Sequence, residues 1–239
     1  MGLAFCCVLA GQALLFAAGD DTSLEEVERA IVERFAAIRS CVATMNTLQT
    51  AETGKDSRVK LETKRRGEWV RKENGFLYRA ESTSRLTQTH AKGSTKVEAS
   101  ATTVSDGVYI VTLTERDGEK SATKRRADVT HTPDIRAMLD ALRKDQVLRR
   151  LPDVKVGFDD CFAIQAIPKN RPDSDIGQTV VYFRKDIGID VHTVVYDKNN
   201  KPIYTSTTTD IRINVDLAPD RFMVVLPDGV KLVDQSKEP

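Results

Sequence analysis

The side chains that could catalyse a reaction or hold a metal are few and scattered in this 239-residue chain. Its three histidines, His90, His131 and His192, lack the Glu-x-x-His and His-x-x-x-His spacings that set two ligands side by side. No Gly-x-Ser-x-Gly segment and no glycine-rich loop between a strand and a helix are present. Asp159 and Asp160 are adjacent carboxylates, a pattern typical of a solvated turn. We therefore expect no enzyme, no metal and no cofactor.

Basic residues are the second group of side chains that could take part in function. Lysine plus arginine total 36 and aspartate plus glutamate 35, so the net charge is only +1. Nucleic-acid-binding proteins normally show a clear basic excess, and that class of partner is excluded. The densest cluster is Lys64-Arg65-Arg66, with Arg71-Lys72 close behind. Such clusters fit solvated strand ends, and they also fit contact with anionic headgroups or with an acidic protein surface.

The N-terminal segment differs in composition from the rest of the chain. Residues 1–19 contain no charged side chain, whereas the chain from Asp20 onward is densely charged. The apolar run ends in Ala17-Ala18-Gly19, which resembles a signal-peptide cleavage site, although no Lys or Arg precedes the run. We predict a signal peptide over residues 1–19 and a mature domain over residues 20–239, with an uncleaved membrane anchor as the alternative.

Two cysteines, Cys41 and Cys161, remain in the predicted mature chain. In an oxidising compartment they could form one disulfide bridge. Single buried cysteines also behave as small hydrophobic residues, and the sequence leaves both alternatives open.

Two segments have the periodicity of helices that must pack on something apolar. Ser23 and Glu26 form a capping box, which predicts a helix start. Apolar residues then recur at spacings of three and four, indicating an amphipathic helix of about twenty residues. They are Leu24, Val27, Ile31, Phe35, Ile38, Val42 and Met45. A similar pattern over 135–151 predicts one helix or two short ones before Pro152.

The rest of the chain alternates with period two and predicts strands. They cover residues 59–64, 76–81, 96–104, 108–114, 161–167, 179–184, 188–197, 202–213 and 222–226. Turn signals such as Ser105-Asp106-Gly107 and Asp117-Gly118 separate them at short intervals, so the sheet is expected to be antiparallel and meandering. The predicted class is mainly β within α+β: one large sheet with helices against it. From these patterns the apolar face is equally compatible with a solid core and with an elongated acyl-chain groove.

Four segments resemble a known family in the order in which they occur. They are 67–78 (GEWVRKENGFLY), 104–110 (VSDGVYI), 214–217 (NVDL) and 222–234 (FMVVLPDGVKLVD). Together they are similar to the outer-membrane lipoprotein carrier (LolA-like) family of periplasmic proteins, over about residues 23–235. The resemblance implies an incomplete antiparallel β-barrel lidded by the N-terminal helix and a helical insert. It also implies an apolar cavity that shields acyl chains, and it places Arg71 or Lys72 where the family has a functionally important arginine.

Three functional hypotheses follow. The first is a monomeric periplasmic carrier or binder of lipids or acylated lipoproteins, working with inner- and outer-membrane sorting components. It predicts a cavity lined by Trp69, Phe76, Tyr78, Ile110 and Phe222. The second is an envelope sensory or protein-interaction domain on the same fold, in which basic patches and edge strands bind a partner. The third and weakest is a hydrolase that uses Asp159 or His131.

Overall fold

The computed structural model describes residues 22–54, 57–73, 75–127, 135–169 and 175–236. The predicted signal peptide and His131 lie outside these ranges. Within them, neither α-helix has the length and apolar character needed to cross a membrane.

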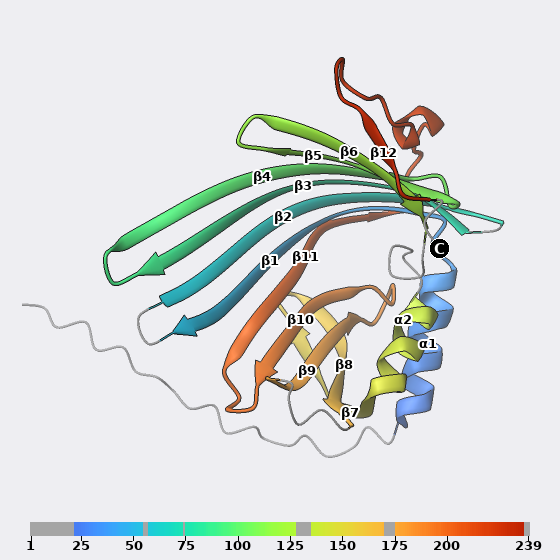
Figure 1. The fold of residues 1–239 in the computed structure, drawn as a ribbon. Helices are drawn as coiled ribbons and strands as arrows, with labels where there is room; N and C mark the ends of the chain where they lie inside the picture. Colours follow the sequence, from blue (N-terminus) through green and yellow to red (C-terminus); the bar gives the residue numbers. More distant parts are fainter. Residues whose placement is uncertain (1–21, 55–56, 74, 128–134, 170–174, 237–239) are drawn as a thin grey trace, which may run out of the picture.

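The fold is built on one twelve-stranded, strongly curved sheet (Figure 1). Its strands are β1 (Ser40–Gly54), β2 (Ser57–Lys72), β3 (Gly75–His90), β4 (Gly93–Ser105), β5 (Tyr109–Arg116), β6 (Glu119–Arg126), β7 (Gln146–Val156), β8 (Asp159–Pro168), β9 (Ile176–Arg184), β10 (Asp190–Asp197), β11 (Pro202–Ile213) and β12 (Leu232–Asp234). The order across the sheet is β12-β6-β5-β4-β3-β2-β1-β11-β10-β9-β8-β7. All pairings are antiparallel except β12 with β6. Because β12 and β7 are edges that do not pair with each other in the described residues, the barrel is incomplete, as predicted.

Two helices lie side by side at one end of the arch (Figure 1). They are α1 (Leu24–Ala36) and α2 (Ile135–Asp145); a 3-10 helix, η2 (Pro219–Phe222), follows later in the chain. The predicted capping box is present, since the Ser23 hydroxyl accepts from the Glu26 amide and the Glu26 carboxylate accepts from the Ser23 amide. The Arg143 guanidinium on α2 donates to the buried Glu28 carboxylate on α1 and joins the two helices.

Both predicted helices are too long, because strands begin where the helical apolar period continues. The first helix ends at Ala36, and Ile38 leads into β1, which is hydrogen-bonded to β2 on one side and β11 on the other. Pairing on both sides and the β-branched residues of this segment favour a strand over three further helical turns. The second helix ends at Asp145, and β7 takes up Val147 to Leu151.

Pro152 lies inside β7 rather than after it. The register of β7 with β8 shifts between Leu151 and Val154, and β7 is an edge strand. A proline is tolerated at such a place because its missing N–H removes no ladder hydrogen bond. The strand predicted over 222–226 is likewise absent: Phe222 closes η2, and residues 223–226 have no regular structure.

The core lies between the helices and the end of the sheet that they cover. Buried α1 residues such as Val27 and Ile31 pack with residues of β1, β2, β8 and β9 in one cluster. Gly188, in the turn before β10, approaches α1 most closely: a Cβ at this glycine would lie 2.3 Å from the Ile31 carbonyl oxygen. Its φ of +69° also falls in the left-handed region that favours glycine.

We predict that Gly188→Ala lowers the free energy of unfolding by at least about 2 kcal/mol, because it adds a clash with α1 to the strain of a positive φ. Gly157→Ala is the matched control, since Gly157 has a φ of +63° and no heavy atom within 4 Å of a built Cβ. Urea unfolding of both variants separates the two costs. Equal losses would show that α1 does not constrain the turn.

Asp190, the first residue of β10, gives a second test of the fold. Burial raises the pKa of this carboxyl to about 6, so the folded state holds the proton more tightly than the unfolded chain does. The stability that this group contributes is complete below about pH 4 and is lost as the pH rises through 6. Asp190→Asn should therefore stabilise the protein at pH 7, by up to about 3 kcal/mol, and have little effect at pH 4. Unfolding curves at the two pH values check the sign.

Candidate functional site

The sheet has an inner face, defined here as the face that carries Trp69 and meets α1, and an opposite outer face. Because side chains alternate along a strand and cross-strand partners share a face, the register assigns every residue of β1–β5. Beyond the core, the inner face carries small, polar uncharged and aliphatic side chains, most of them half-buried. They include Met45, Thr47, Leu61, Thr63, Ser82, Ser84, Leu86, Val97, Ala99 and Ala101.

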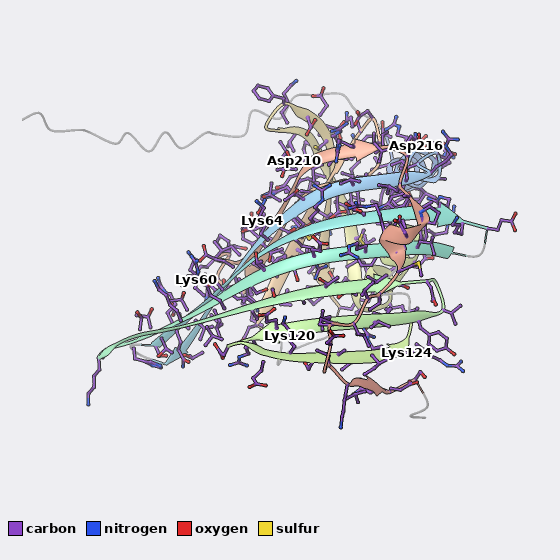
Figure 2. The ribbon with its side chains drawn as sticks, turned by 90° about the horizontal axis from the view of Figure 1, so that it is seen from above. Lys60, Lys64, Lys120, Lys124, Asp210 and Asp216 are labelled. Carbon is purple, nitrogen blue, oxygen red and sulfur yellow. The ribbon has the colours of Figure 1, made fainter. Side chains whose placement is uncertain are left out.

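Charge is segregated between these two faces. Among the described inner-face positions of β1–β5 there is no aspartate or glutamate, and the charged residues are Arg65, Arg71 and Arg116. The outer face carries the lysines and glutamates of the same strands. Figure 2, seen from above the arch, labels Lys60 and Lys64 of this face. The inner face is therefore the part of the long strands suited to an uncharged or weakly anionic ligand.

The aromatic end of the inner face is closed by the helices. The Trp69 ring lies 5.4 Å from the Phe35 ring of α1 and 5.4 Å, edge-on, from the Phe76 ring. All three side chains are buried in the core cluster. Trp69 and Phe76, both predicted to line a cavity, thus lie together on the inner face as part of this packed cluster.

Tyr78, Ile110 and Phe222, the other predicted lining residues, differ in position. Tyr78 is half-buried on the inner face against the cluster, and Ile110 is buried on the same face outside the cluster. Phe222 is also buried but outside the cluster, and the chain around it packs on the outer face, where Arg221 pairs with an outer-face carboxylate. The structure thus brings four of the five residues to one face and separates Phe222 from them.

The outer-face carboxylate is Glu68, whose side chain is only 3% exposed. Arg221 donates to its two oxygens at 2.6 and 2.7 Å, and Arg66 donates at 3.2 Å. Burial alone would raise the pKa of Glu68, but these hydrogen bonds and charges hold it below its usual value. Arg79 also donates to the Arg221 carbonyl oxygen. These contacts hold the C-terminal segment against the sheet.

Arg71, predicted as a functional basic residue, contacts the end of α1 in the structure. Its guanidinium donates to the carbonyl oxygens of Ile38 and Phe35 at 3.1 and 3.2 Å, at the C-terminal end of α1. The same group lies 4.8 Å from the centre of the Phe76 ring and 5.5 Å from that of Phe35. A cation at a helix C-terminus satisfies free carbonyls and the helix dipole. Lys72, the alternative, is exposed on the outer face.

Arg65 and Tyr78 lie near each other on the inner face, which the composition of their segments does not indicate. Arg65 belongs to the cluster Lys64-Arg65-Arg66, whose composition alone does not distinguish its members. Side chains on a strand alternate between the two faces, so Arg65 lies on the same face as Trp69. Lys64 and Arg66 lie on the opposite face. Burial raises the pKa of the Tyr78 phenol, and the positive charge of the nearby Arg65 opposes that rise.

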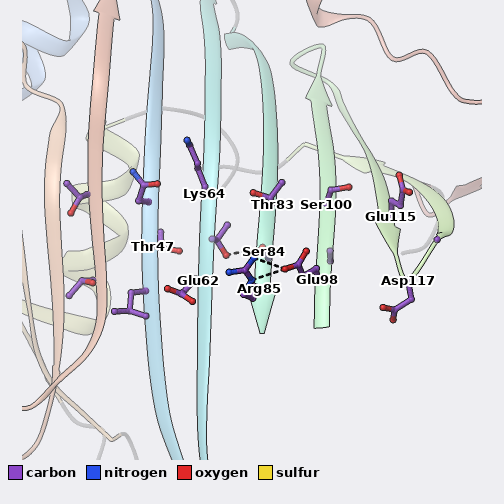
Figure 3. Close-up of a pocket in the computed structure, with 17 residues that line it drawn as sticks. Thr47, Glu62, Lys64, Thr83, Ser84, Arg85, Glu98, Ser100, Glu115 and Asp117 are labelled. Atoms are coloured by element: carbon purple, nitrogen blue, oxygen red, sulfur yellow. Dashed lines mark hydrogen bonds and ion pairs between the residues drawn. The ribbon is translucent and has the colours of Figure 1, made fainter. Parts of the chain in front are cut away.

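A hollow of about 860 Å³ extends across β1–β5 and β11 (Figure 3). Its lining includes the outer-face residues Lys64, Thr83, Arg85, Glu98 and Glu115, and Arg85 pairs with Glu98 at 2.8 Å. The inner-face positions Thr47, Thr63, Ser84 and Ala99 also border it. None of the five predicted cavity residues borders it. The hollow is polar and of mixed charge, so it does not offer the apolar lining that acyl chains need.

Asp159 and Asp160, the adjacent carboxylates considered as catalytic candidates, both form ion pairs. Asp160 pairs with Lys155 at 3.3 Å and Asp159 with Arg184 at 3.6 Å, across the β7–β8 hairpin and its neighbour. No group of three or more His, Cys, Asp or Glu side chains within the described ranges is arranged to hold a metal ion.

Cys41 and Cys161 are free thiols, and both are buried. Burial raises the pKa of Cys41 to about 11, which leaves it protonated and unreactive at neutral pH. The Cys161 thiol donates to the Asp159 carbonyl oxygen. Their strands, β1 and β8, are separated in the sheet by β11, β10 and β9. The two cysteines therefore pack as small buried hydrophobic residues and do not form a disulfide bridge.

The chain matches no known family model, and no curated protein sequence matches it. Its structure is similar to an uncharacterized conserved protein from Thermus thermophilus, with a TM-score of 0.53, 10% identity, and coverage of 87% of this chain and 98% of that one. At this identity the likeness extends to the fold alone.

Two weaker likenesses also cover most of the chain. MucB has a TM-score of 0.45 and 11% identity, with 84% of this chain and 62% of MucB covered, and it has also been solved in complex with MucA(peri). A LolA superfamily protein from Nitrosomonas europaea has a TM-score of 0.28 and 12% identity, with 83% and 98% covered. This chain thus spans less than two thirds of MucB. The open curved sheet with its helices has the incomplete-barrel architecture that the sequence resemblance implies.

The position of Arg71 yields a prediction. Arg71→Ala should lower the free energy of unfolding by about 3 kcal/mol, because it removes two charge-assisted hydrogen bonds and two ring contacts. Lys72→Ala, its exposed neighbour, should change stability by less than about 0.5 kcal/mol. Chemical unfolding measures both. A stable Arg71→Ala protein that fails only in ligand binding would show that Arg71 is functional rather than structural.

Proposed function

We propose that this protein is an exported, non-enzymatic carrier or binding protein that shields the acyl chains of lipids or lipoproteins on its inner face. The observation that carries the proposal is the segregation of charge. The inner face of β1–β5 has no carboxylate among its described positions and is lined by small, polar uncharged and aliphatic side chains, while α1 and α2 cover only one end. Acyl chains bind to such surfaces because apolar area leaves water without an ionised group losing its hydration.

The residue assignments of this proposal follow the faces of the sheet. Tyr78, Leu61 and Leu86 contact the ligand, and Trp69 and Phe76 form the closed aromatic end. Phe222 and the charged outer-face residues of the hollow have no part in it. The apolar N-terminal segment and the resemblance to periplasmic carriers support the periplasm as the location, with a role in lipoprotein sorting as the process.

A protein partner is the second candidate, and specific exposed residues favour it. Phe158 at the tip of the β7–β8 hairpin is fully exposed, and Val225 in the C-terminal segment is 85% exposed. Large apolar side chains in such positions are common at protein interfaces. In this alternative the sheet edges and hairpin tips bind the partner, and the inner face binds no lipid.

Adjacent residues on one strand separate the two candidates. Ser84 lies on the inner face and Thr83 on the outer face, where Thr83 is paired with Lys64. We predict that Ser84→Glu weakens binding of a fluorescent fatty acid by about tenfold or more, since it buries a carboxylate under the acyl chain. Thr83→Glu should bind as the unchanged protein does. Circular dichroism confirms that both variants are folded.

Native mass spectrometry of protein purified from membranes provides the independent readout, with co-purifying lipid expected. An unchanged protein that neither carries lipid nor binds the fatty acid refutes the carrier. Equal weakening by both substitutions would place the ligand elsewhere.

A further inference from the structure

Arg65 stands apart from the other charged residues of the inner face. Of the three inner-face arginines in the described part of β1–β5, Arg71 is held by the end of α1. Arg116 lies at the end of β5, with Asp117 3.5 Å away. Arg65 lies near the middle of β2, between the packed aromatic end and the open part of the face. It is exposed, which is the condition for contact with a ligand.

Among the described inner-face positions of β1–β5, no carboxylate is present that would neutralise Arg65. Its cross-strand partners are Met45 on β1 and Ser82 on β3, and its neighbours along the inner face of β2 are Thr63 and Gly67. A cation among uncharged neighbours produces a positive potential that nearby acids do not cancel. An anion placed there is attracted more strongly than at the hollow described above, because the lining of that hollow includes the carboxylates of Glu62, Glu98 and Glu115.

Gly67 and Tyr78 shape the place next to Arg65. Gly67 lies between Arg65 and Trp69 on the inner face and has no side chain, and a Cβ built on it would lie 3.9 Å from the Tyr78 ring. The ring therefore lies close to the β2 backbone, near enough to Arg65 for that positive charge to act on its phenol. Two hydrogen-bond donors from neighbouring strands are thus placed together at the boundary of the core.

We propose that Arg65 and Tyr78 form a subsite for an anionic headgroup, a carboxylate or a phosphate, of an amphiphile whose acyl chain lies along the inner face. This inference rests on the proposed function and adds the chemical class of the ligand. The acyl chain extends over Leu61 and Leu86, and the headgroup lies at the end nearer to the helices.

The hydrogen-bond donors of both residues suit this role. Burial raises the pKa of the Tyr78 phenol above its ordinary value, so the phenol keeps its proton at neutral pH. Its O–H is a donor that a ligand oxygen can accept from. The guanidinium has further N–H groups in a planar fork that matches carboxylate and phosphate oxygens.

The test compares ligands of equal chain length at physiological salt. Dodecanoate, dodecyl phosphate and dodecanol are titrated into the mature protein by displacement of a fluorescent fatty acid. The two anionic ligands should bind at least about tenfold more tightly than dodecanol, as expected for charge-assisted hydrogen bonds. Arg65→Met should abolish this preference while leaving dodecanol affinity within about twofold, and Tyr78→Phe should reduce the preference in part.

Lys64→Met is the matched control, because it removes one positive charge from the adjacent residue on the outer face. It should keep the preference, and a loss equal to that of Arg65→Met would overturn the subsite in favour of general charge attraction. Equal affinity of the unchanged protein for all three ligands overturns the subsite but leaves the acyl-chain carrier intact. Binding of none of the three refutes the carrier and the subsite together. Saturable binding of inorganic phosphate that Arg65→Met abolishes, without chain-dependent binding, would assign a free-anion site instead and also overturn the proposal.

Discussion

The docking of α1 at one end of the sheet is the constraint on which the rest of the structure depends. The helix is held by contacts of two kinds: a close backbone approach at Gly188, and the Arg71 guanidinium against the carbonyls of Phe35 and Ile38. Each joins α1 to a distant strand or turn, so the helix has one position along the arch. Because that position covers only the aromatic end, the inner face of the long strands extends beyond the helices.

The length of the strands and the segregation of their charges have a common consequence. β2 and β3 are sixteen residues each, well above the mean strand length of about five to six residues. Strands of this length extend past the core, and a second layer would be needed to bury both faces. The outer face is instead solvated through lysines, arginines and glutamates, and the described inner-face positions of β1–β5 are uncharged apart from their arginines. This difference between the faces is the basis of the proposed function.

Arg65 and Arg71 illustrate how two residues of one type on one strand can differ in role. Both point to the inner face, six residues apart on β2. Arg71 is used by the fold, because the end of α1 and two aromatic rings surround it. Arg65 lies beyond the helices, next to Tyr78 and uncharged neighbours. The position of α1 therefore decides that Arg71 is structural and that Arg65 is left exposed.

The sequence by itself determined the class of fold, the start of α1, and most strands and turns. Period-two alternation and turn chemistry are local properties, and so is the Ser23–Glu26 capping box. The ends of the helices were not determined in this way, since apolar spacings of three to four continue through Val42 and Leu151 into strands. Only pairing with distant strands ended those helices. Tertiary structure alone also decided the role of Arg71, the separation of Phe222 from Trp69, and the free state of the two cysteines, because each depends on which residues distant in sequence share a face.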